Sequence, residues 1–555
     1  MTKATGVQKV ILGLVIVVVA GVIATVVLAV VLLVNQQTTT TVSTAANGAT
    51  TSTPPPSTTT YPPNTNASQG FKDAAAILLG AIDPSVNPCD DFYQFTCGNW
   101  LKNHPIPADR TRIGAYDVAQ LTIDTNLAMM LGNISATDQT QPKTVLAAAL
   151  YYQKCVSYND TAHNGANLLA VLNGTGRTGF PMVDANWAPS DPKNLWTTIG
   201  YLESQYALST LFQSYVTVDW GNVTRNALFL NQGALSLPLD YYILPQFKPY
   251  IDDYVTNLFT LAQLLRDETS SKVTDAQLMD DTLKVVQLET QLALAMSPDT
   301  LLRNYAFQYN EYTLTKLNAT YQHIGWDGYL SSLLKDVDPH YQMDSVVLTE
   351  PGYIGVVNSL IAGSLISPRT FANFIGLKFL EDNALYLGSP YRTALLEFRK
   401  NVYDENDLPP GATSCVEDLT NMMPYSTGYL YVNSIPNRDN ITKDVLLQST
   451  KVIEQFMGMV DSLQWMSDTT KNASHTKAAG LIKNIGYPDW LLNTTALDLY
   501  NKKYIDSMLS LGSAVSLWDI SSALKYAFQR TENFQLLEQA PDRKNFLASP
   551  ATVNA

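Results

Sequence analysis

The chain has 555 residues, with 35 Lys and Arg against 49 Asp and Glu, a formal net charge of −14. This length is sufficient for several lobes around a large core and excludes the class of marginal small domains. The acidic balance, with no basic run after the first ten positions, argues against nucleic acid and anionic membrane surfaces as partners.

The first element in chain order is an uncharged apolar run at residues 10–34. A helix of that length crosses a bilayer core of about 30 Å, and the run is too long for the apolar core of a signal peptide. Lys3 and Lys9 precede the run and no charge follows it until Lys72, so the positive-inside rule keeps residues 1–9 cytoplasmic. We therefore predict a single-pass type II protein of the plasma membrane, with its ectodomain outside the cell.

The next segment, residues 35–71, is rich in Ser, Thr and Pro and includes TTTT, PPP and STTT. Such a composition cannot bury enough apolar surface to offset its ordering entropy, which predicts an extended extracellular stalk. Nine N-x-S/T sequons agree with a lumenal location, and each predicts a surface glycan. They are Asn66, Asn133, Asn159, Asn173, Asn222, Asn318, Asn440, Asn472 and Asn493.

From residue 72 onward the pattern predicts a mainly α-helical lobe. Apolar residues recur at helical spacing over 251–265, and Thr274 with Gln277 forms a capping-box pattern before a second helix. Further helices are expected around 357–387 and 447–464. Strand-like alternation is limited to short pieces at 428–432 and 552–555.

Four cysteines occur in the chain, and two of them lie in the block PCDDFYQFTCGNWLKNHPIP at residues 88–107. Asp90 or Asp91 is a suitable N-cap for a helix between Cys89 and Cys97. A helical rise of 1.5 Å per residue would separate the two Cα atoms by about 12 Å, whereas a disulfide tolerates about 7 Å. These two cysteines should therefore not bond each other. Cys155 and Cys415 could pair with them or with one another, and buried free thiols are the remaining alternative.

The cysteine block resembles the start of the ectodomain in the neprilysin and endothelin-converting-enzyme family of zinc metallopeptidases. Further stretches resemble that family in the same order, namely NQGALSLPLDYYI (231–243), CVEDLTNMMPYSTGYLYV (415–432), IGYPDWLLN (485–493) and NFLASPATVNA (545–555). The resemblance covers residues 72–555 and implies the large helical lobe of a membrane-anchored peptidase. It also implies a Cys155–Cys415 disulfide, with Cys89 and Cys97 bonded to cysteines of a C-terminal part that is not in this sequence.

The zinc motif of the family is missing from the chain. Such a peptidase needs two His at i and i+4 on one helix, with an adjacent Glu as general base. The five histidines, His104, His163, His323, His340 and His475, are at least 17 residues apart, and none is followed by Glu. We therefore expect no cofactor and no catalytic residue in this chain, although the complete family member would carry zinc.

Part of a substrate-binding site remains by resemblance. Asn554 and Ala555 match the first two positions of the edge strand that binds peptide substrates in the family. Arg112 and Asp117 align with an Arg/Asp pair that helps bind the C-terminal end of the substrate, and a guanidinium suits a carboxylate. A surface ion pair is the simpler interpretation, and Arg110 makes the alignment ambiguous.

The sequence thus predicts a neprilysin-like metalloendopeptidase ectodomain that is inactive as given, so whether this chain is itself an enzyme stays open. The alternative from another class is a non-catalytic peptide-binding or decoy ectodomain. A third hypothesis is a separately encoded catalytic partner, which could be disulfide-linked through Cys89 or Cys97. An isolated lobe of this kind is also expected to leave apolar surface exposed.

Overall fold

The computed structural model describes residues 69–135, 138–158, 164–189, 191–337, 343–408, 411–538, 540–546 and 548–553. The predicted anchor, most of the predicted stalk, and Asn554 and Ala555 lie outside these ranges. No helix of the described ranges combines the length and the apolar character that crossing a membrane requires. The type II anchor therefore stays a prediction.

The chain divides into two units, residues 1–97 and residues 98–555. The first unit contains α2 (Gln69–Ala81) and the start of α3 (Phe92–Asn103). Of the two candidate caps, Asp91 is the one that acts, because its Oδ1 accepts a hydrogen bond from Gln94 N at 2.8 Å. Helix α2 begins three residues before the predicted start of the lobe at residue 72.

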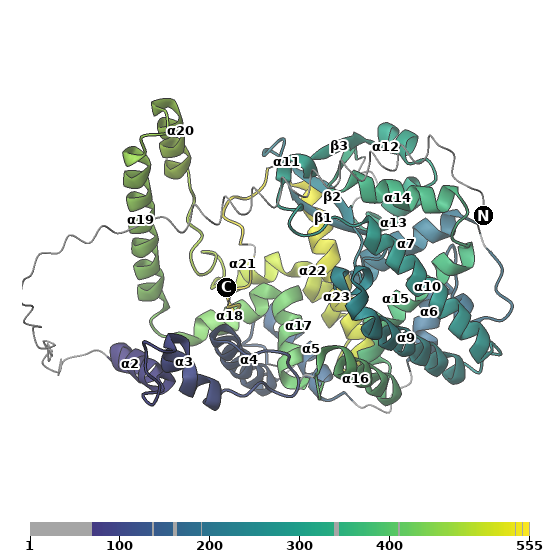
Figure 1. Ribbon diagram of the computed structural model, residues 1–555, viewed down its shortest axis with the longest axis horizontal. Coiled ribbons are helices and arrows are strands. Elements are labelled where there is room, and N and C mark those ends of the chain that lie inside the picture. Colours follow the sequence, from purple (N-terminus) through teal and green to yellow (C-terminus); the bar gives the residue numbers. More distant parts are fainter. Residues whose placement is uncertain are drawn as a thin grey trace, which may run out of the picture. The chain divides into compact units, whose positions relative to one another are not determined.

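The second unit is mainly helical, which confirms the predicted fold class (Figure 1). Its largest core cluster packs the helices that surround a small sheet. These helices are α6 (Gly165–Leu172), α7 (Lys193–Tyr206), α8 (Leu239–Ile243), α9 (Lys248–Glu268), α10 (Asp275–Ala295), α12 (Leu314–Thr320), α13 (Trp326–Leu333), α14 (Pro351–Ala362), α15 (Pro368–Asn383) and α16 (Ser389–Tyr403).

A second core cluster is formed by helices that are far apart in sequence. They are α4 (Ala115–Asn133), α5 (Lys143–Val156), α17 (Gly411–Met422), α22 (Lys502–Leu509) and α23 (Leu517–Phe534). A third, small cluster joins α18 (Pro424–Ser434) to α21 (Thr494–Tyr500). Short helices complete the fold: α11 (Tyr305–Gln308), η1 (Pro181–Val183), η2 (Pro245–Phe247), η3 (Ala384–Tyr386) and η4 (Gln535–Leu537).

The four-stranded sheet of the second unit was not expected from the sequence. Its order is β1-β2-β4-β3, and its strands are β1 (Phe212–Val218), β2 (Asn226–Gln232), β3 (Asn310–Thr313) and β4 (Ser345–Leu348). β1 and β2 form an antiparallel hairpin, β2 pairs with β4 in parallel, and β3 pairs with β4 antiparallel. Residues in β1 alternate between buried and more exposed positions, as in a strand with one covered face.

The expected helices are largely confirmed. The 251–265 pattern lies in α9, and the capping residue Thr274 accepts a hydrogen bond from Gln277 N at the start of α10. The stretch expected at 357–387 is two helices, because Gly363 and Ser364 end α14 and Ser367 caps α15. The helix expected at 447–464 is α19 (Arg438–Ser462), which packs beside α20 (Asp468–Ala479) (Figure 1).

Both predicted strand pieces are wrong within the described residues. Residues 428–432 belong to α18, where Pro424 occupies the first turn and Tyr425, Gly428 and Val432 form a buried face at helical spacing. Thr552 and Val553 are not in a strand. The backbone N–H of Val553 is bound by a side chain rather than by a neighbouring strand.

Candidate functional site

The start of α4 carries the two upstream residues that were predicted to bind substrate. Asp117 lies in the first turn, and its Oδ2 accepts a hydrogen bond from Gly114 N at 2.7 Å, which caps the helix. Arg112 is exposed just before the helix, and no ion pair joins it to Asp117 in the part of the chain that the structure describes. The simpler interpretation, an ion pair between these two residues, is therefore wrong.

The neighbouring arginine that made the alignment ambiguous has a different role. Arg110 Nη2 lies 3.3 Å from Glu417 Oε1 of α17, and both side chains are partly exposed. This contact ties the segment before α4 to a helix about 300 residues later in the sequence. Of Arg110 and Arg112, Arg112 is therefore the one that does not pair with Glu417.

The segment 549–553, which leads to Asn554 and Ala555, lies against the same helix α4. Gln120 Nε2 donates a hydrogen bond to Ala551 O at 3.2 Å, and Gln120 Oε1 accepts one from Val553 N at 2.7 Å. The side-chain amide thus bonds to the carbonyl of Ala551 and the N–H of Val553, as a backbone peptide group of an adjacent strand would. One turn of α4 therefore connects the predicted Arg112/Asp117 site to the residue before Asn554.

Asp124, one helical turn after Gln120, orients this amide. Its Oδ1 accepts a hydrogen bond from Gln120 Nε2 at 2.8 Å, which directs the amide nitrogen toward Ala551 O and leaves the amide oxygen for Val553 N. Burial raises the pKa of Asp124 to about 6, although the bond from Gln120 acts in the opposite direction. Neither residue was predicted from the sequence to belong to a site. Their i, i+4 spacing was a signal, but a weak one.

Helix α18 supports the segment from another side. Ser549 Oγ donates to Pro424 O at 3.1 Å, and Pro550 packs on Gly428. A Cβ at Gly428 would lie 2.8 Å from Pro550 Cδ, which is closer than real Cβ contacts. Ala551 is fully buried in the second core cluster. Segment 549–553 is therefore held by α4, α18 and the second core cluster together.

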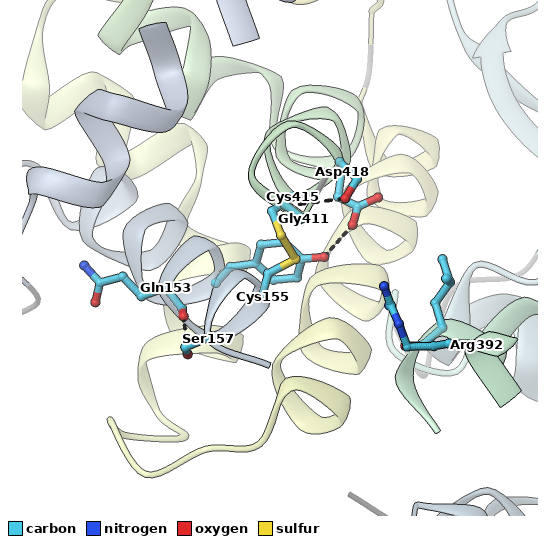
Figure 2. Close-up of a disulfide and its surroundings, with 10 residues drawn as sticks. Gln153, Cys155, Ser157, Arg392, Gly411, Cys415 and Asp418 are labelled. Carbon is cyan, nitrogen blue, oxygen red and sulfur yellow. Dashed lines mark hydrogen bonds between the residues drawn. A yellow bond between two sulfur atoms is a disulfide. The ribbon is translucent and has the colours of Figure 1, made fainter. Parts of the chain in front are cut away.

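The Cys155–Cys415 disulfide is present and confirms the pairing that the resemblance implied. It links α5 to α17 with a Cα–Cα distance of 5.9 Å across a sequence separation of 260 (Figure 2). Beside it, Tyr151 OH donates to Asp418 Oδ2 at 2.7 Å. Burial raises the pKa of the Asp418 carboxyl. The disulfide thereby fixes the second core cluster, on which α4 and segment 549–553 both rest.

Cys89 and Cys97 carry free thiols, with Cys89 exposed and Cys97 partly buried. Their predicted partners, whether in a further segment or in another chain, are untested.

The described residues do not fit a zinc site, because no three His, Cys, Asp or Glu side chains lie close enough to hold a metal ion. His104 Nδ1 lies 2.9 Å from Trp100 O, and His475 Nε2 lies 2.7 Å from Asp461 Oδ1. His163 and His340 are outside the described ranges. No catalytic step through a metal is therefore derived for this chain.

Seven of the predicted glycan sites are in the described ranges, and all seven side chains are exposed. They are Asn133, Asn173, Asn222, Asn318, Asn440, Asn472 and Asn493. Asn66 and Asn159 lie outside these ranges, and glycosylation itself stays a prediction.

Comparisons with known proteins agree with this architecture. Residues 88–488 match the model of "Peptidase family M13". Neprilysin-11 of Caenorhabditis elegans is 26% identical over 501 residues, which cover 89% of this chain and 57% of the relative. Neprilysin of Mus musculus is 26% identical over 504 residues, which cover 87% of this chain and 64% of the relative. The chain thus spans less than two thirds of the length of these curated relatives.

The fold is also found among solved structures. A Mycobacterium tuberculosis zinc metalloprotease in complex with an inhibitor superimposes with a TM-score of 0.67 at 21% identity, covering 86% of this chain and 67% of that one. The fold, the disulfide and the family match over 88–488 agree with one another. This chain belongs to peptidase family M13.

Proposed function

We propose that this chain forms the helical, substrate-admitting lobe of a neprilysin-like peptidase, held at the outer face of the plasma membrane by residues 10–34. The observation that carries the proposal is the double hydrogen bond from Gln120 to segment 551–553. It holds residues 551–553, which precede Asn554 and Ala555 in sequence, against the helix that begins just after Arg112 and carries Asp117, and so supports a shared substrate-binding role for these four residues. Peptide substrates fit the peptidase family to which the chain belongs.

In this proposal Arg112 binds the C-terminal carboxylate of a short peptide, since a guanidinium pairs with a carboxylate through two parallel hydrogen bonds. Asp117 stabilises the start of α4 and so holds Arg112 at the site. Asn554 and Ala555 bind the peptide backbone as an added strand. Gln120 and α18 keep that strand in position. The chain contains no HExxH motif, so we propose that it does not hydrolyse peptides by itself.

Helix α19 supports the presence of a further packing partner. It buries only Val460, while Val445, Val452, Phe456 and Met459 are between 41% and 68% exposed along one stripe. Apolar surface of this extent usually marks an interface. The matched relatives extend well beyond the part shared with this chain. We propose that the zinc-bearing lobe of the enzyme packs on this stripe.

The test of peptide recognition uses the full chain in lipid nanodiscs and one short peptide with either a free or an amidated C-terminus. We expect the free carboxylate to improve affinity about tenfold, the scale of one charge-assisted contact. The R112A variant should abolish this difference. The matched R110A variant should preserve it, because Arg110 is paired with Glu417. Equal affinities of both peptides for the parent chain contradict the proposal.

The test of hydrolysis uses the same preparation with added zinc. We expect no peptide cleavage and no stoichiometric zinc binding. Cleavage that a chelator abolishes would show that this chain carries its own metal site, contrary to the proposal.

A further inference from the structure

The hairpin loop between β1 and β2 has the sequence Trp-Gly-Asn-Val-Thr at residues 220–224. It places a sequon asparagine, Asn222, at an exposed reverse turn, with an aromatic residue two positions before it and its Thr two positions after it. Such a spacing puts the aromatic ring and the asparagine in one short loop.

The loop is held by the carboxylate of Asp219, which is fully buried. Asp219 Oδ1 accepts hydrogen bonds from Gly221 N at 2.8 Å and from Asn222 N at 3.2 Å. Asp219 Oδ2 accepts one from Arg225 Nε at 2.8 Å. Several bonds to one buried carboxylate fix the backbone on both sides of Asn222.

Asn222 itself is in a conformation that leaves its amide nitrogen available. Its Oδ1 accepts hydrogen bonds from Thr224 Oγ1 at 2.6 Å and from Thr224 N at 3.2 Å. Within the described part of the chain its Nδ2 donates no hydrogen bond. The atom to which an N-linked sugar attaches is therefore not engaged, and the residue that carries it is exposed.

A hollow with aromatic walls begins one residue before Asn222. It has a volume of about 760 Å³ and is lined by Trp220, Gly221, Tyr305, Ala306 and Tyr309. Trp220 is 37% exposed and rests on Phe229, with ring centroids 4.8 Å apart, while Tyr305 stands nearly perpendicular to it at 5.3 Å. A Cβ at Gly221 would lie 2.3 Å from Tyr309 Oη, so glycine is required for this approach.

We propose that Asn222 carries an N-linked glycan whose first N-acetylglucosamine packs into this hollow against Trp220 and Tyr305. In the transfer step, Asn222 Nδ2 bonds to the anomeric carbon of a polyisoprenyl-diphosphate-linked oligosaccharide. The bond from that carbon to the diphosphate oxygen breaks, the lipid diphosphate leaves, and Nδ2 loses one proton. The cellular transferase and its lipid-linked donor supply the sugar. This inference rests on the extracellular location in the proposed function.

The chemistry of the hollow suits a pyranose ring. One face of such a ring presents C–H groups, which pack well on the electron-rich face of Trp or Tyr. The ring edges keep their hydroxyls in solvent, so no polar group is buried without a partner. Because the sugar would be attached to Asn222, the residue after the lining residue Gly221, its effective concentration would be high and a weak contact would be sufficient. The glycan would thereby stabilise the β1–β2 loop.

The experiment expresses the full chain in a eukaryotic secretory host and trims its glycans to the first sugar. Site occupancy is read by mass spectrometry, and hydrogen exchange is measured on the 219–226 loop. We expect an occupied Asn222 and loop exchange about three- to tenfold faster in N222Q, the scale of one aromatic contact. In a W220L or Y305L background, N222Q should have a smaller effect, because only the loss of the Asn222 Oδ1 bonds to Thr224 remains. Y305L perturbs the core less, since Tyr305 is 66% exposed.

The matched control is N472Q, which removes a sequon in α20 and should not change exchange in the 219–226 loop. An unoccupied Asn222 beside occupied Asn133 or Asn493 overturns the inference and leaves the proposed topology intact. An equal effect of N222Q in the parent and in both aromatic variants also overturns it. If no sequon is occupied, the inference and the extracellular location both fail.

Discussion

Glu203 of α7 is an acidic residue in an almost fully buried position. Its carboxylate accepts hydrogen bonds from Tyr329 OH at 2.7 Å, Ser214 N at 2.7 Å and Ser214 Oγ at 2.8 Å. Within the described ranges, no ion pair with a cation involves it. Burial therefore raises its pKa from 4.5 to about 7 despite these bonds.

The raised pKa of Glu203 predicts a pH-dependent free energy of unfolding. The folded state holds a proton that the unfolded state releases near pH 4.5, so this contribution is full below about pH 4.5 and is lost as the pH rises through about 7. The loss amounts to about 3 kcal/mol for this group. We expect E203Q to remove this contribution to the pH dependence of the unfolding free energy. Urea unfolding between pH 4.5 and 8 provides the measurement.

The control for this prediction is S214A, which removes a hydrogen bond but keeps the carboxyl group. It should lower stability at every pH and retain the slope, extended to higher pH because the bond that it removes lowers the pKa of Glu203. Burial also raises the pKa of Glu381 to about 7. The contribution of Glu381 to the pH dependence of the unfolding free energy should therefore remain in E203Q. An unchanged slope in E203Q would mean that Glu203 does not hold its proton in the folded state.

At the scale of elements, α19 combines a regular helix with an apolar stripe that stays 41–68% exposed although α20 packs beside the helix. Isolated stripes of this kind promote self-association. We expect V452Q/F456Q to reduce binding of a hydrophobic dye and the associated fraction of the purified chain by about half. Light scattering after size exclusion provides the measurement.

The matched control for α19 is L365Q, which replaces a single exposed leucine in the turn after α14. Scattered apolar residues are normal on protein surfaces, so this substitution should have little effect. Equal behaviour of both variants would show that the α19 stripe is not a packing surface.

At the scale of the whole molecule, the Cys155–Cys415 disulfide closes a covalent loop across a sequence separation of 260. It joins α5 and α17 within the second core cluster, which also holds α4 and Ala551. Removing such a cross-link increases the freedom of the unfolded chain and lowers stability by about 2–5 kcal/mol. We expect C155S/C415S to unfold several degrees lower in calorimetry.

The matched variant for the disulfide is C89S/C97S, which replaces the two free thiols. It should leave the unfolding temperature of this chain unchanged. A similar loss of stability in both double variants would indicate that Cys89 and Cys97 are also bonded in the folded protein.

The sequence by itself determined the helical class, the N-cap of α10 and the family, because helical periodicity and the cysteine block are local patterns. Local patterns failed at 428–432, where alternating apolar residues looked like a strand. There, Pro424 and the packing of Pro550 on Gly428 select a helix. The β1–β4 sheet was also missed, since only β1 and β2 are neighbours in sequence, while helices separate β3 and β4 from that hairpin and from each other.

Only the tertiary structure decided which residues meet at the candidate site. Gln120 and Val553 are 433 positions apart, and no sequence pattern in either segment predicts their hydrogen bond. The same holds for Arg110 with Glu417, and for the aromatic hollow that Trp220 shares with Tyr305. Side-chain contacts between distant segments depend on how the helices pack around a common core, and that packing is a property of the whole chain.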